Sequence, residues 1–308
     1  MSSSSSEARG LLYFVGLGLG DHRDVTARGA SAIASSSRIF LEAYTSILGV
    51  SVEALEAAFG KRIELAHRET VESESDSILG PALRGETVSF LVVGDPFGAT
   101  THTDLLLRAR AAGVRTVIVH NASIMNAVGA CGLQLYSFGA TISVPFFRDG
   151  WEPDSFYDRI VHNAAGGLHT LCLLDIKVRE PDFDELVRSG RRVFREPRFM
   201  TVNRAARQLL LIESRRGGGV CGPDTLAFGV ARVGQESERI VSGTLAELLT
   251  VDFGPPLHSL VLVGGVLHDL EHEMARLFAV KRDTELGKVP IEEGGWDDAE
   301  GRKDEDDN

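Results

Sequence analysis

The stretch Gly-Asp-Pro-Phe-Gly-Ala-Thr-Thr-His-Thr-Asp at residues 94–104 decides how the rest of the chain is organised. It follows the run Val-Ser-Phe-Leu-Val-Val at residues 88–93, whose near lack of polar alternation predicts a strand buried on both faces. Pro96 favours an extended conformation for Asp95, and a helix is expected to begin at Thr103. The sequence therefore predicts a loop at the carboxyl end of a central strand, which is the edge of a parallel sheet where ligands bind.

Strands and helices alternate on both sides of this loop. Between residues 11 and 122 the apolar strands are nearly continuous and are separated by predicted helices, which is typical of a parallel sheet covered by helices. The later strands are more closely spaced, which favours a mixed sheet. We therefore predict an α/β fold with two α/β domains, the first with a parallel sheet (residues 11–122) and the second with a mixed sheet (residues 123–290).

Some individual elements have clear sequence signals. Ser51 and Gly60 bracket a predicted helix at Val52–Phe59, because serine favours the start of a helix and glycine its end. One helix is also predicted over residues 70–84, with acidic residues in its first turn, and another over residues 123–133, with small residues on one face. These boundaries are expectations from local pattern alone.

Composition and charge limit the class of protein. The chain has 308 residues, of which 43% are apolar and 25% are charged, as in ordinary soluble globular proteins. Its formal net charge of −12 argues against a nucleic-acid binder that uses a basic face. A serine-rich head (residues 1–10) and a mostly charged, acidic tail (residues 291–308) are predicted to be disordered.

The cysteines and the apolar runs indicate a compartment. Cys131, Cys172 and Cys221 are far apart and show no zinc-binding spacing, so a reducing compartment and a protein without a bound metal are expected. No apolar run reaches the roughly 18 residues needed to span a bilayer. We therefore predict a cytoplasmic protein that binds no membrane and no nucleic acid.

A glycine-rich turn has two readings. Gly-Leu-Gly-Leu-Gly at residues 16–20 resembles a dinucleotide fingerprint, and Glu42 ends the next strand, where a ribose-binding acid would lie. However, Asp21 occupies the position of the third glycine of that fingerprint. The spacing favours a turn that lets another segment or a ligand pass close, and a nicotinamide site is the alternative.

Three other features also have a structural and a functional reading. His268 and His272 are four residues apart on a predicted helix, but no third metal ligand is suggested nearby, so a solvated helix face is favoured. Residues 217–219 are three glycines without the Lys-Ser/Thr of a phosphate loop, which indicates a flexible surface loop. Asp175 interrupts an apolar strand, so its carboxylate needs either Lys177 or a place in a site near the sheet edge.

Six segments together resemble the diphthine synthases, a family of methyltransferases with the tetrapyrrole-methylase fold. The resemblance runs from about residue 11 to about residue 278 and is most specific at residues 94–134. The segments are LYFVGLGLG (12–20), LEAYTSIL (41–48), GDPFGATTHTD (94–104), HNASIMNAVGACGLQ (120–134), LHTLCLLDIKV (168–178) and PLHSLV (256–261).

The resemblance implies a homodimer whose protomers each bind S-adenosylmethionine between two α/β domains and release S-adenosylhomocysteine. It implies methyl transfer to the aminocarboxypropyl-modified histidine of translation elongation factor 2, a step of diphthamide biosynthesis. Eukaryotic-type members methylate both the amine and the carboxylate, which gives the methyl ester. The positions that match the family's cofactor contacts are Leu19, Asp95, Gly98, Ser123, Ile124, Leu174, Val233 and His258.

The residues themselves add candidates on the substrate side and leave alternatives open. Tyr44, Thr45 and His102 follow predicted strands and are expected to lie near the substrate, and no catalytic base is assigned. Position alone favours a structural cap over a site role for His258. The alternative functions are a small-molecule tetrapyrrole methylase, a nicotinamide-dependent oxidoreductase, and an inactive module that only binds the translation factor.

Overall fold

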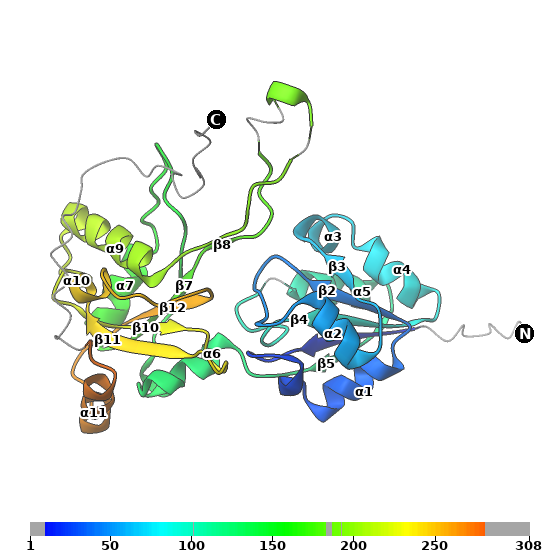
Figure 1. Ribbon diagram of the computed structural model, residues 1–308, viewed down its shortest axis with the longest axis horizontal. Coiled ribbons are helices and arrows are strands. Elements are labelled where there is room, and N and C mark those ends of the chain that lie inside the picture. The colour runs from blue at the N-terminus through cyan, green and yellow to red at the C-terminus, as the bar shows by residue number, and fades with distance from the viewer. Residues whose placement is uncertain (1–9, 101, 183–186, 192, 281–308) are drawn as a thin grey trace, which may run out of the picture.

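The first of two lobes is built on a parallel sheet of five strands in the order β3-β2-β4-β1-β5 (Figure 1). The computed structural model describes residues 10–100, 102–182, 187–191 and 193–280. Because all five strands run the same way, their carboxyl ends meet at one edge of the sheet. The strands are β1 (Leu11–Gly16), β2 (Arg38–Glu42), β3 (Glu64–Ala66), β4 (Thr87–Val92) and β5 (Arg115–Val119).

Helices cover both faces of this sheet, as the sequence predicts. On β4, Phe90 packs into the cluster under α3, α4 and α5, and Leu91 packs into the cluster under α1 and α2. Both side chains are fully buried, which explains the lack of polar alternation in this strand. The helices are α1 (Ala27–Ser35), α2 (Val52–Phe59), α3 (Arg68–Glu72), α4 (Asp76–Leu83) and α5 (Thr103–Ala111), with a 3₁₀ turn η1 at His22–Asp24.

The second lobe has a five-stranded sheet in the order β11-β10-β12-β7-β6. Strands β6 and β7 are parallel and the other pairs are antiparallel, so the predicted mixed sheet is confirmed. A short antiparallel ribbon, β8 (Ile176–Lys177) with β9 (Arg198–Phe199), extends from β7. The sheet strands are β6 (Ile142–Val144), β7 (Thr170–Leu174), β10 (Leu226–Ala231), β11 (Arg239–Thr244) and β12 (His258–Leu262).

Two hydrophobic clusters hold this second sheet between helices. One lies under α7, α9 and α10 and includes the fully buried Cys172, which therefore belongs to the core. The other includes Val128 and Leu267 and lies towards α6 and α11. The helices are α6 (Ile124–Ala127), α7 (Tyr157–Ala165), α9 (Val202–Arg216), α10 (Leu245–Leu248) and α11 (Asp269–Leu277), with 3₁₀ turns η2 (Val128–Cys131) and η3 (Leu135–Ser137).

The single helix predicted over residues 70–84 is wrong, because two helices, α3 and α4, occupy this stretch. Arg108 of α5 explains the break. Its Nη2 donates to the carbonyl oxygen of Val71 and its Nη1 donates to Oγ of Ser75, each at 2.7 Å. The prediction over residues 123–133 is also too long, since α6 gives way to the 3₁₀ turn η2, which ends at Gly132.

The predicted division at residues 122 and 123 falls between β5, the last strand of the first sheet, and α6. Residues 1–9 and 281–308 lie outside the described residues, and with them nearly all of the predicted disordered head and the whole of the predicted acidic tail. Within the described ranges, no helix combines the length and apolar character needed to cross a membrane.

Candidate functional site

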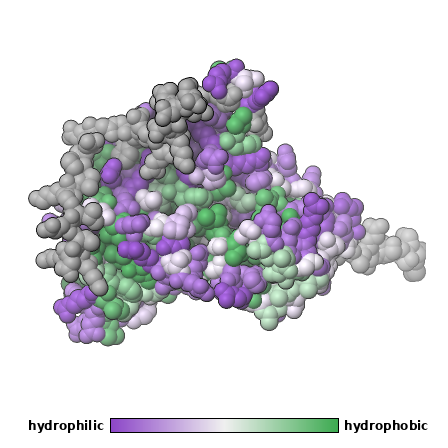
Figure 2. Space-filling view, viewed as in Figure 1, coloured by the Kyte–Doolittle hydropathy of each residue, from purple (hydrophilic) through white to green (hydrophobic). Residues whose placement is uncertain are grey.

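A cavity of about 350 Å³ lies where the two lobes meet. Pockets for small molecules commonly have volumes of about 300–1,000 Å³. Hydrophobic residues reach the surface near the centre of Figure 2, between the lobes of Figure 1. The first lobe lines the cavity with the loops after β1, β2 and β4, and the second lobe with residues of α6, β6, β7, β10 and β12 and their loops.

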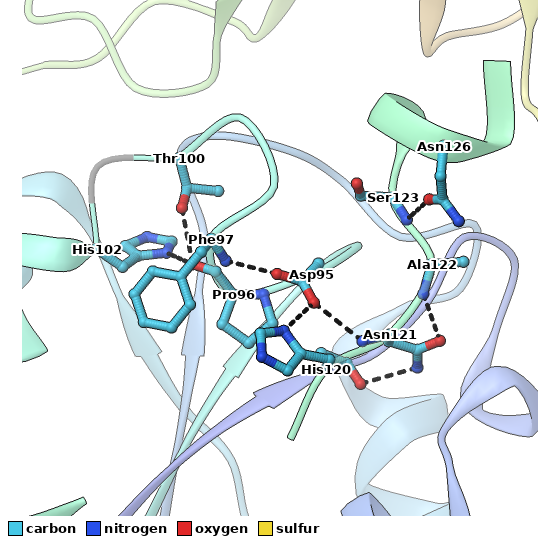
Figure 3. A network of polar contacts seen from close by, with 11 residues as sticks. Asp95, Pro96, Phe97, Thr100, His102, His120, Asn121, Ala122, Ser123 and Asn126 are labelled. Atoms are coloured by element: carbon cyan, nitrogen blue, oxygen red, sulfur yellow. Dashed lines mark hydrogen bonds and ion pairs between the residues drawn. The ribbon is translucent and has the colours of Figure 1, made fainter. Parts of the chain in front are cut away.

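The loop after β4 is held by the carboxylate of Asp95 (Figure 3). Its Oδ1 accepts a hydrogen bond from the backbone N–H of Phe97 at 2.9 Å, and its Oδ2 accepts one from Asn121 N at 3.1 Å. Oδ2 also lies 2.8 Å from Nδ1 of His120. Burial raises the pKa of Asp95, but these hydrogen bonds outweigh burial and leave the pKa below its usual value.

Asp95 does not line the cavity. Both of its oxygens are already engaged by protein donors, and only 13% of its side chain is exposed. The structure therefore gives the carboxylate a role in joining the loops after β4 and β5, whereas sequence reasoning expected it to accept hydrogen bonds from a cofactor. The carboxylate thus shapes the loop that carries Gly98 from outside the cavity.

Asn121 connects the same network to the glycine-rich turn. Its Nδ2 donates to the carbonyl oxygens of Gly16 and Asp24, each at 3.0 Å. Asp24 in turn accepts hydrogen bonds from the backbone N–H groups of Leu19 and Gly20, at 3.1 and 2.7 Å. The loops after β1, β4 and β5 are thus one hydrogen-bonded unit, and Leu19 at its edge lines the cavity.

Close backbone approach explains why the turn is rich in glycine. A Cβ atom at Gly16 would lie 2.6 Å from the carbonyl oxygen of Gly94, so no larger residue fits. The reading of residues 16–20 as a turn that lets another segment pass close is therefore confirmed.

Gly98 and Ser123 bring the two lobes into contact beside the cavity. A Cβ atom at Gly98 would lie 2.5 Å from Oγ of Ser123, so a glycine is required for this approach. Ser123 is the N-cap of α6, and its backbone N–H donates to Oδ1 of Asn126 at 2.8 Å. Gly98, Ser123 and Ile124, which the resemblance assigns to cofactor contacts, all line the cavity. Gly98 comes from the first lobe, and Ser123 and Ile124 lead into the second.

The opposite wall contains Leu174, Val233 and His258. Nδ1 of His258 accepts a hydrogen bond from Val202 N at 3.4 Å, so Nε2 carries the proton and faces the carbonyl oxygens of Gly254 and Pro255, 3.1 and 3.0 Å away. Burial lowers the pKa of His258, which favours its neutral form. The residue thus both caps the start of β12 and lines the cavity.

The two non-glycine residues with positive φ in the described part of the chain also line this cavity. They are Ala99 (φ 63°) and Arg232 (φ 49°). Such backbone conformations cost about 1–3 kcal/mol and cluster at functional sites. Nη1 of Arg232 donates to the carbonyl oxygens of Phe253, at 2.8 Å, and Pro255, which fixes the segment leading to His258. Sequence reasoning missed both residues, because neither amino acid signals a positive φ.

Tyr44 and Thr45 line the cavity as predicted positions, and Glu42 sets their backbone. Oε1 of Glu42 accepts hydrogen bonds from the N–H groups of Tyr44 and Thr45, at 2.8 and 2.7 Å, and Oε2 accepts the Thr45 hydroxyl at 2.7 Å. Burial raises the pKa of Glu42. Because its carboxylate is buried and already hydrogen-bonded, Glu42 is a loop cap, and the nicotinamide reading loses its ribose-binding acid.

His102 is not brought to the cavity. Its side chain is fully buried, and Nδ1 donates to the carbonyl oxygen of Pro96 at 3.1 Å (Figure 3). Its ring packs edge-on against Phe90 with centroids 5.2 Å apart, and burial lowers its pKa. His102 therefore holds the loop through Pro96 from within the core, and contact with a substrate in the cavity is not expected.

Both open readings of Asp175 apply. Its Oδ2 lies 3.4 Å from Nζ of Lys177, so the predicted partner is present, and the residue also lines the cavity. By contrast, His268 caps α11 by accepting a hydrogen bond from Leu270 N at 3.2 Å. Within the described ranges, no three His, Cys, Asp or Glu side chains form a group that could hold a metal ion.

Comparisons with known proteins agree in fold and sequence. The family of tetrapyrrole (corrin/porphyrin) methylases matches residues 11–249. The diphthine methyl ester synthase of Mus musculus is 53% identical over 274 residues, which cover 88% of this chain and 97% of that protein. The diphthine methyl ester synthase of Dictyostelium discoideum is 54% identical over 275 residues, covering 89% of this chain and 100% of that protein. A crystal structure of diphthine synthase matches with a TM-score of 0.75 and 34% identity, covering 88% of this chain and 96% of the other.

Proposed function

The chain belongs to the tetrapyrrole methylase family and, within it, to the diphthine methyl ester synthases, and from this premise we propose that it methylates the aminocarboxypropyl-modified histidine of translation elongation factor 2. It is an S-adenosylmethionine-dependent methyltransferase of diphthamide biosynthesis. The product proposed for the complete reaction is the methyl ester of diphthine, with methyl groups on both the amine and the carboxylate.

One observation supports the cofactor site above all others. Of the positions that the resemblance assigns to cofactor contacts, all except Asp95 line the single cavity at the lobe junction. They come from six separate stretches of the chain and from both lobes. We propose that they hold S-adenosylmethionine there and that Asp95 contributes by shaping the loop that carries Gly98. The proposed contacts are the cavity-lining residues Leu19, Gly98, Ser123, Ile124, Leu174, Val233 and His258.

The residues present fit such a cofactor. Gly98 approaches Ser123 too closely for a larger side chain, and Leu19, Ile124 and Leu174 add apolar surface for a nucleoside. When bound, S-adenosylmethionine supplies an electrophilic methyl group. The neutral His258 avoids repulsion with its sulfonium charge. Holding the donor and acceptor in line supplies a large part of the acceleration in such a displacement.

On the substrate side, we propose that Tyr44 and Thr45 contact the modified histidine or its surroundings. Glu42 fixes the backbone of both residues, so their side chains are presented by a rigid turn at the carboxyl end of β2. Because the substrate works in translation, a cytoplasmic location is proposed.

We also propose a homodimer, supported by apolar side chains exposed on the second lobe. Tyr136 and Leu270 are 83% and 60% exposed, and Leu135 and Leu277 are exposed as well. The hydrogen bond from Gln134 N to Glu271 at 2.9 Å joins the two segments that carry them. Sedimentation equilibrium over a range of concentrations tests the dimer, and a monomer at all concentrations would contradict it.

A labelling experiment tests the activity. The full chain is incubated with methyl-labelled S-adenosylmethionine and elongation factor 2 that carries the unmethylated aminocarboxypropyl-histidine, and the factor is mapped by mass spectrometry. Label at that single histidine is expected, and none on a factor in which the histidine is replaced. A folded chain that binds S-adenosylhomocysteine yet labels a porphyrinoid instead would indicate the small-molecule methylase, and complex formation without turnover would indicate an inactive module.

A further inference from the structure

Asp175 is the one carboxylate among the described residues that line the cavity. It lies between β7 and β8, where the chain leaves the second sheet for the β8–β9 ribbon. Its side chain is 19% exposed, so it is accessible from solvent yet largely enclosed. A largely enclosed carboxylate that lines a cavity together with Arg68 and Arg232 is a candidate for binding a charged ligand.

The position of this carboxylate is fixed from several sides. The backbone N–H of Asp175 donates to the carbonyl oxygen of Val144 at 3.1 Å, and its carbonyl oxygen accepts from Met200 N at 3.0 Å. Oδ2 accepts from Phe146 N at 3.0 Å and lies 3.4 Å from Nζ of Lys177. Oδ1 has no hydrogen-bond partner within the described ranges, so one oxygen of a well-held carboxylate is free to accept.

An opposite charge lines the same cavity from the first lobe. The guanidinium of Arg68 stacks over the ring of Tyr44, 5.3 Å from its centroid, and its only ion pair within the described residues is with Glu72 at 3.8 Å. An aminocarboxypropyl group carries an ammonium and a carboxylate. The cavity therefore presents Asp175 for the ammonium and Arg68 for the carboxylate, from opposite lobes. Arg232 also lines the cavity, but its guanidinium already donates to the carbonyl oxygens of Ser237, Phe253 and Pro255.

We infer that Asp175 binds the amino group of the substrate's aminocarboxypropyl side chain and assists its N-methylation. This inference rests on the proposed function. Oδ1 accepts a charge-assisted hydrogen bond from the ammonium and orients the nitrogen after it loses a proton to water. The cofactor carries an ammonium as well, so the test below measures affinity for S-adenosylhomocysteine separately from N-methylation.

The step balances without a further reactant. The nitrogen lone pair forms the new N–CH₃ bond while the C–S bond breaks, and the sulfur keeps that electron pair. The methylated ammonium then loses a proton to water, and Oδ1 relays that proton, before the next methyl transfer. The quaternary ammonium that finally forms has no N–H, so this hydrogen bond does not act in methylation of the carboxylate.

Asp175→Asn tests the inference in the full chain, because asparagine keeps the shape and removes the charge. General-base groups typically contribute about 10²–10⁴-fold, and a hydrogen-bonding carboxylate is expected at the low end. N-methylation should slow by at least about tenfold at pH 7, with accumulation of species that carry fewer N-methyl groups. Ester formation on a factor already trimethylated at the amine should change less than about threefold.

Two further readouts separate this role from a structural one. The reduction in N-methylation rate caused by Asp175→Asn should be smaller at about pH 9, where the amine no longer depends on the carboxylate for deprotonation. The affinity of the variant for S-adenosylhomocysteine should stay within about twofold, or about 0.4 kcal/mol, of that of the unaltered chain. Asp182→Asn is the matched control, because Asp182 lies in the segment that follows β8 but does not line the cavity. This variant should behave like the unaltered chain.

Three results would overturn the inference. They are unchanged N-methylation, an equal loss of N-methylation and ester formation, and a parallel loss of S-adenosylhomocysteine affinity, which would assign Asp175 to the cofactor's own amino group. If the asparagine variant does not fold, Asp175→Glu keeps the charge one methylene farther out and should show a smaller, still pH-dependent loss. If the unaltered chain labels no factor, the proposed function fails; if it labels and the variant equals it, only this inference fails.

Discussion

Oδ2 of Asp95 lies 2.8 Å from Nδ1 of His120, which joins the loop after β4 to the segment that follows β5. The contact is made at the rim of the first sheet, and the segment leads directly into Ser123 and the second lobe. The shape of the cavity therefore depends on a carboxylate that does not touch the space it controls.

Asp95→Ala should weaken binding of S-adenosylhomocysteine by about tenfold or more, equivalent to about 1.4 kcal/mol. The substitution leaves the N–H groups of Phe97 and Asn121 and Nδ1 of His120 without their acceptor, so the loop that carries Gly98 loses its conformation. Titration calorimetry with the full chain measures the effect. Asp104→Ala, which removes an exposed carboxylate on α5, is the control and should bind normally.

Gly98→Ala should reduce affinity for the same ligand by about tenfold or more. The added Cβ would lie 2.5 Å from Oγ and 2.9 Å from Cβ of Ser123, so the loop and the start of α6 must separate. Gly222→Ala is the matched control, because a Cβ there has no heavy atom within 4 Å. Equal affinities of the two variants would show that the close approach does not shape the site.

Stability should fall as the pH drops below about 6.5, the ordinary pKa of histidine. Burial lowers the pKa of His67, His102 and His258, so the folded state resists protonation that the unfolded chain accepts. The free energy of unfolding is therefore highest above the unfolded pKa and decreases as the pH falls towards the folded values. Urea unfolding between pH 8 and 5.5 measures the slope.

Replacing His102 with phenylalanine should make that slope shallower, because His102 is fully buried. His22, which is exposed, provides the control substitution His22→Gln. An unchanged slope in the His102 variant would show that other groups cause the acid sensitivity.

Glu213 should stabilise the chain from neutral pH down to about pH 4.5 and lose that contribution towards pH 2. Burial raises its pKa, but hydrogen bonds from the N–H groups of Cys221 and Gly219 and from the Tyr157 hydroxyl outweigh burial and lower the pKa to about 2. Glu213→Gln should cost about 1–2 kcal/mol at pH 7, because glutamine accepts hydrogen bonds without the charge, and less at pH 3. Glu273→Gln, at an exposed position of α11, should cost nothing at either pH.

The same contacts correct the reading of the three-glycine loop. The N–H groups of Gly219 and Gly218 donate to Glu213 and to the Tyr157 hydroxyl, at 2.6 and 2.8 Å, so the loop is held in place. The sequence shows the glycines, which suggest flexibility, but the acceptors lie on α9 and α7. Such an anchor is visible only after the chain has folded.

Local signals predicted the elements whose ends are set locally. Ser51 accepts a hydrogen bond from Ala54 N at 3.3 Å and Gly60 adopts the left-handed conformation, so α2 begins and ends where its cap residues indicate. The break between α3 and α4 was not predictable in this way, because Arg108 is more than thirty residues away in sequence from the groups it binds. Distant side chains can override helix propensity.

In the candidate site too, features set by local sequence were predictable and features set by distant residues were not. The loop at residues 94–104 was predicted from its strand, its proline and its glycines, and it does flank the cavity. The positive φ of Ala99 and Arg232 was not predictable, because the surrounding structure imposes it. The occupied oxygens of Asp95 were also hidden, since their donors lie at Asn121 and His120 on another strand end.

The passage from β5 to α6 is the one covalent crossing between the lobes in the described part of the chain. On a ribosome, the first sheet is complete before the strands of the second emerge, and such units generally fold in order of synthesis. A nascent chain would thus present half a binding pocket until translation is almost finished. Two separately expressed halves, cut at this crossing, would regain ligand affinity only by reassembling, which makes the ligand a reporter of chain completion.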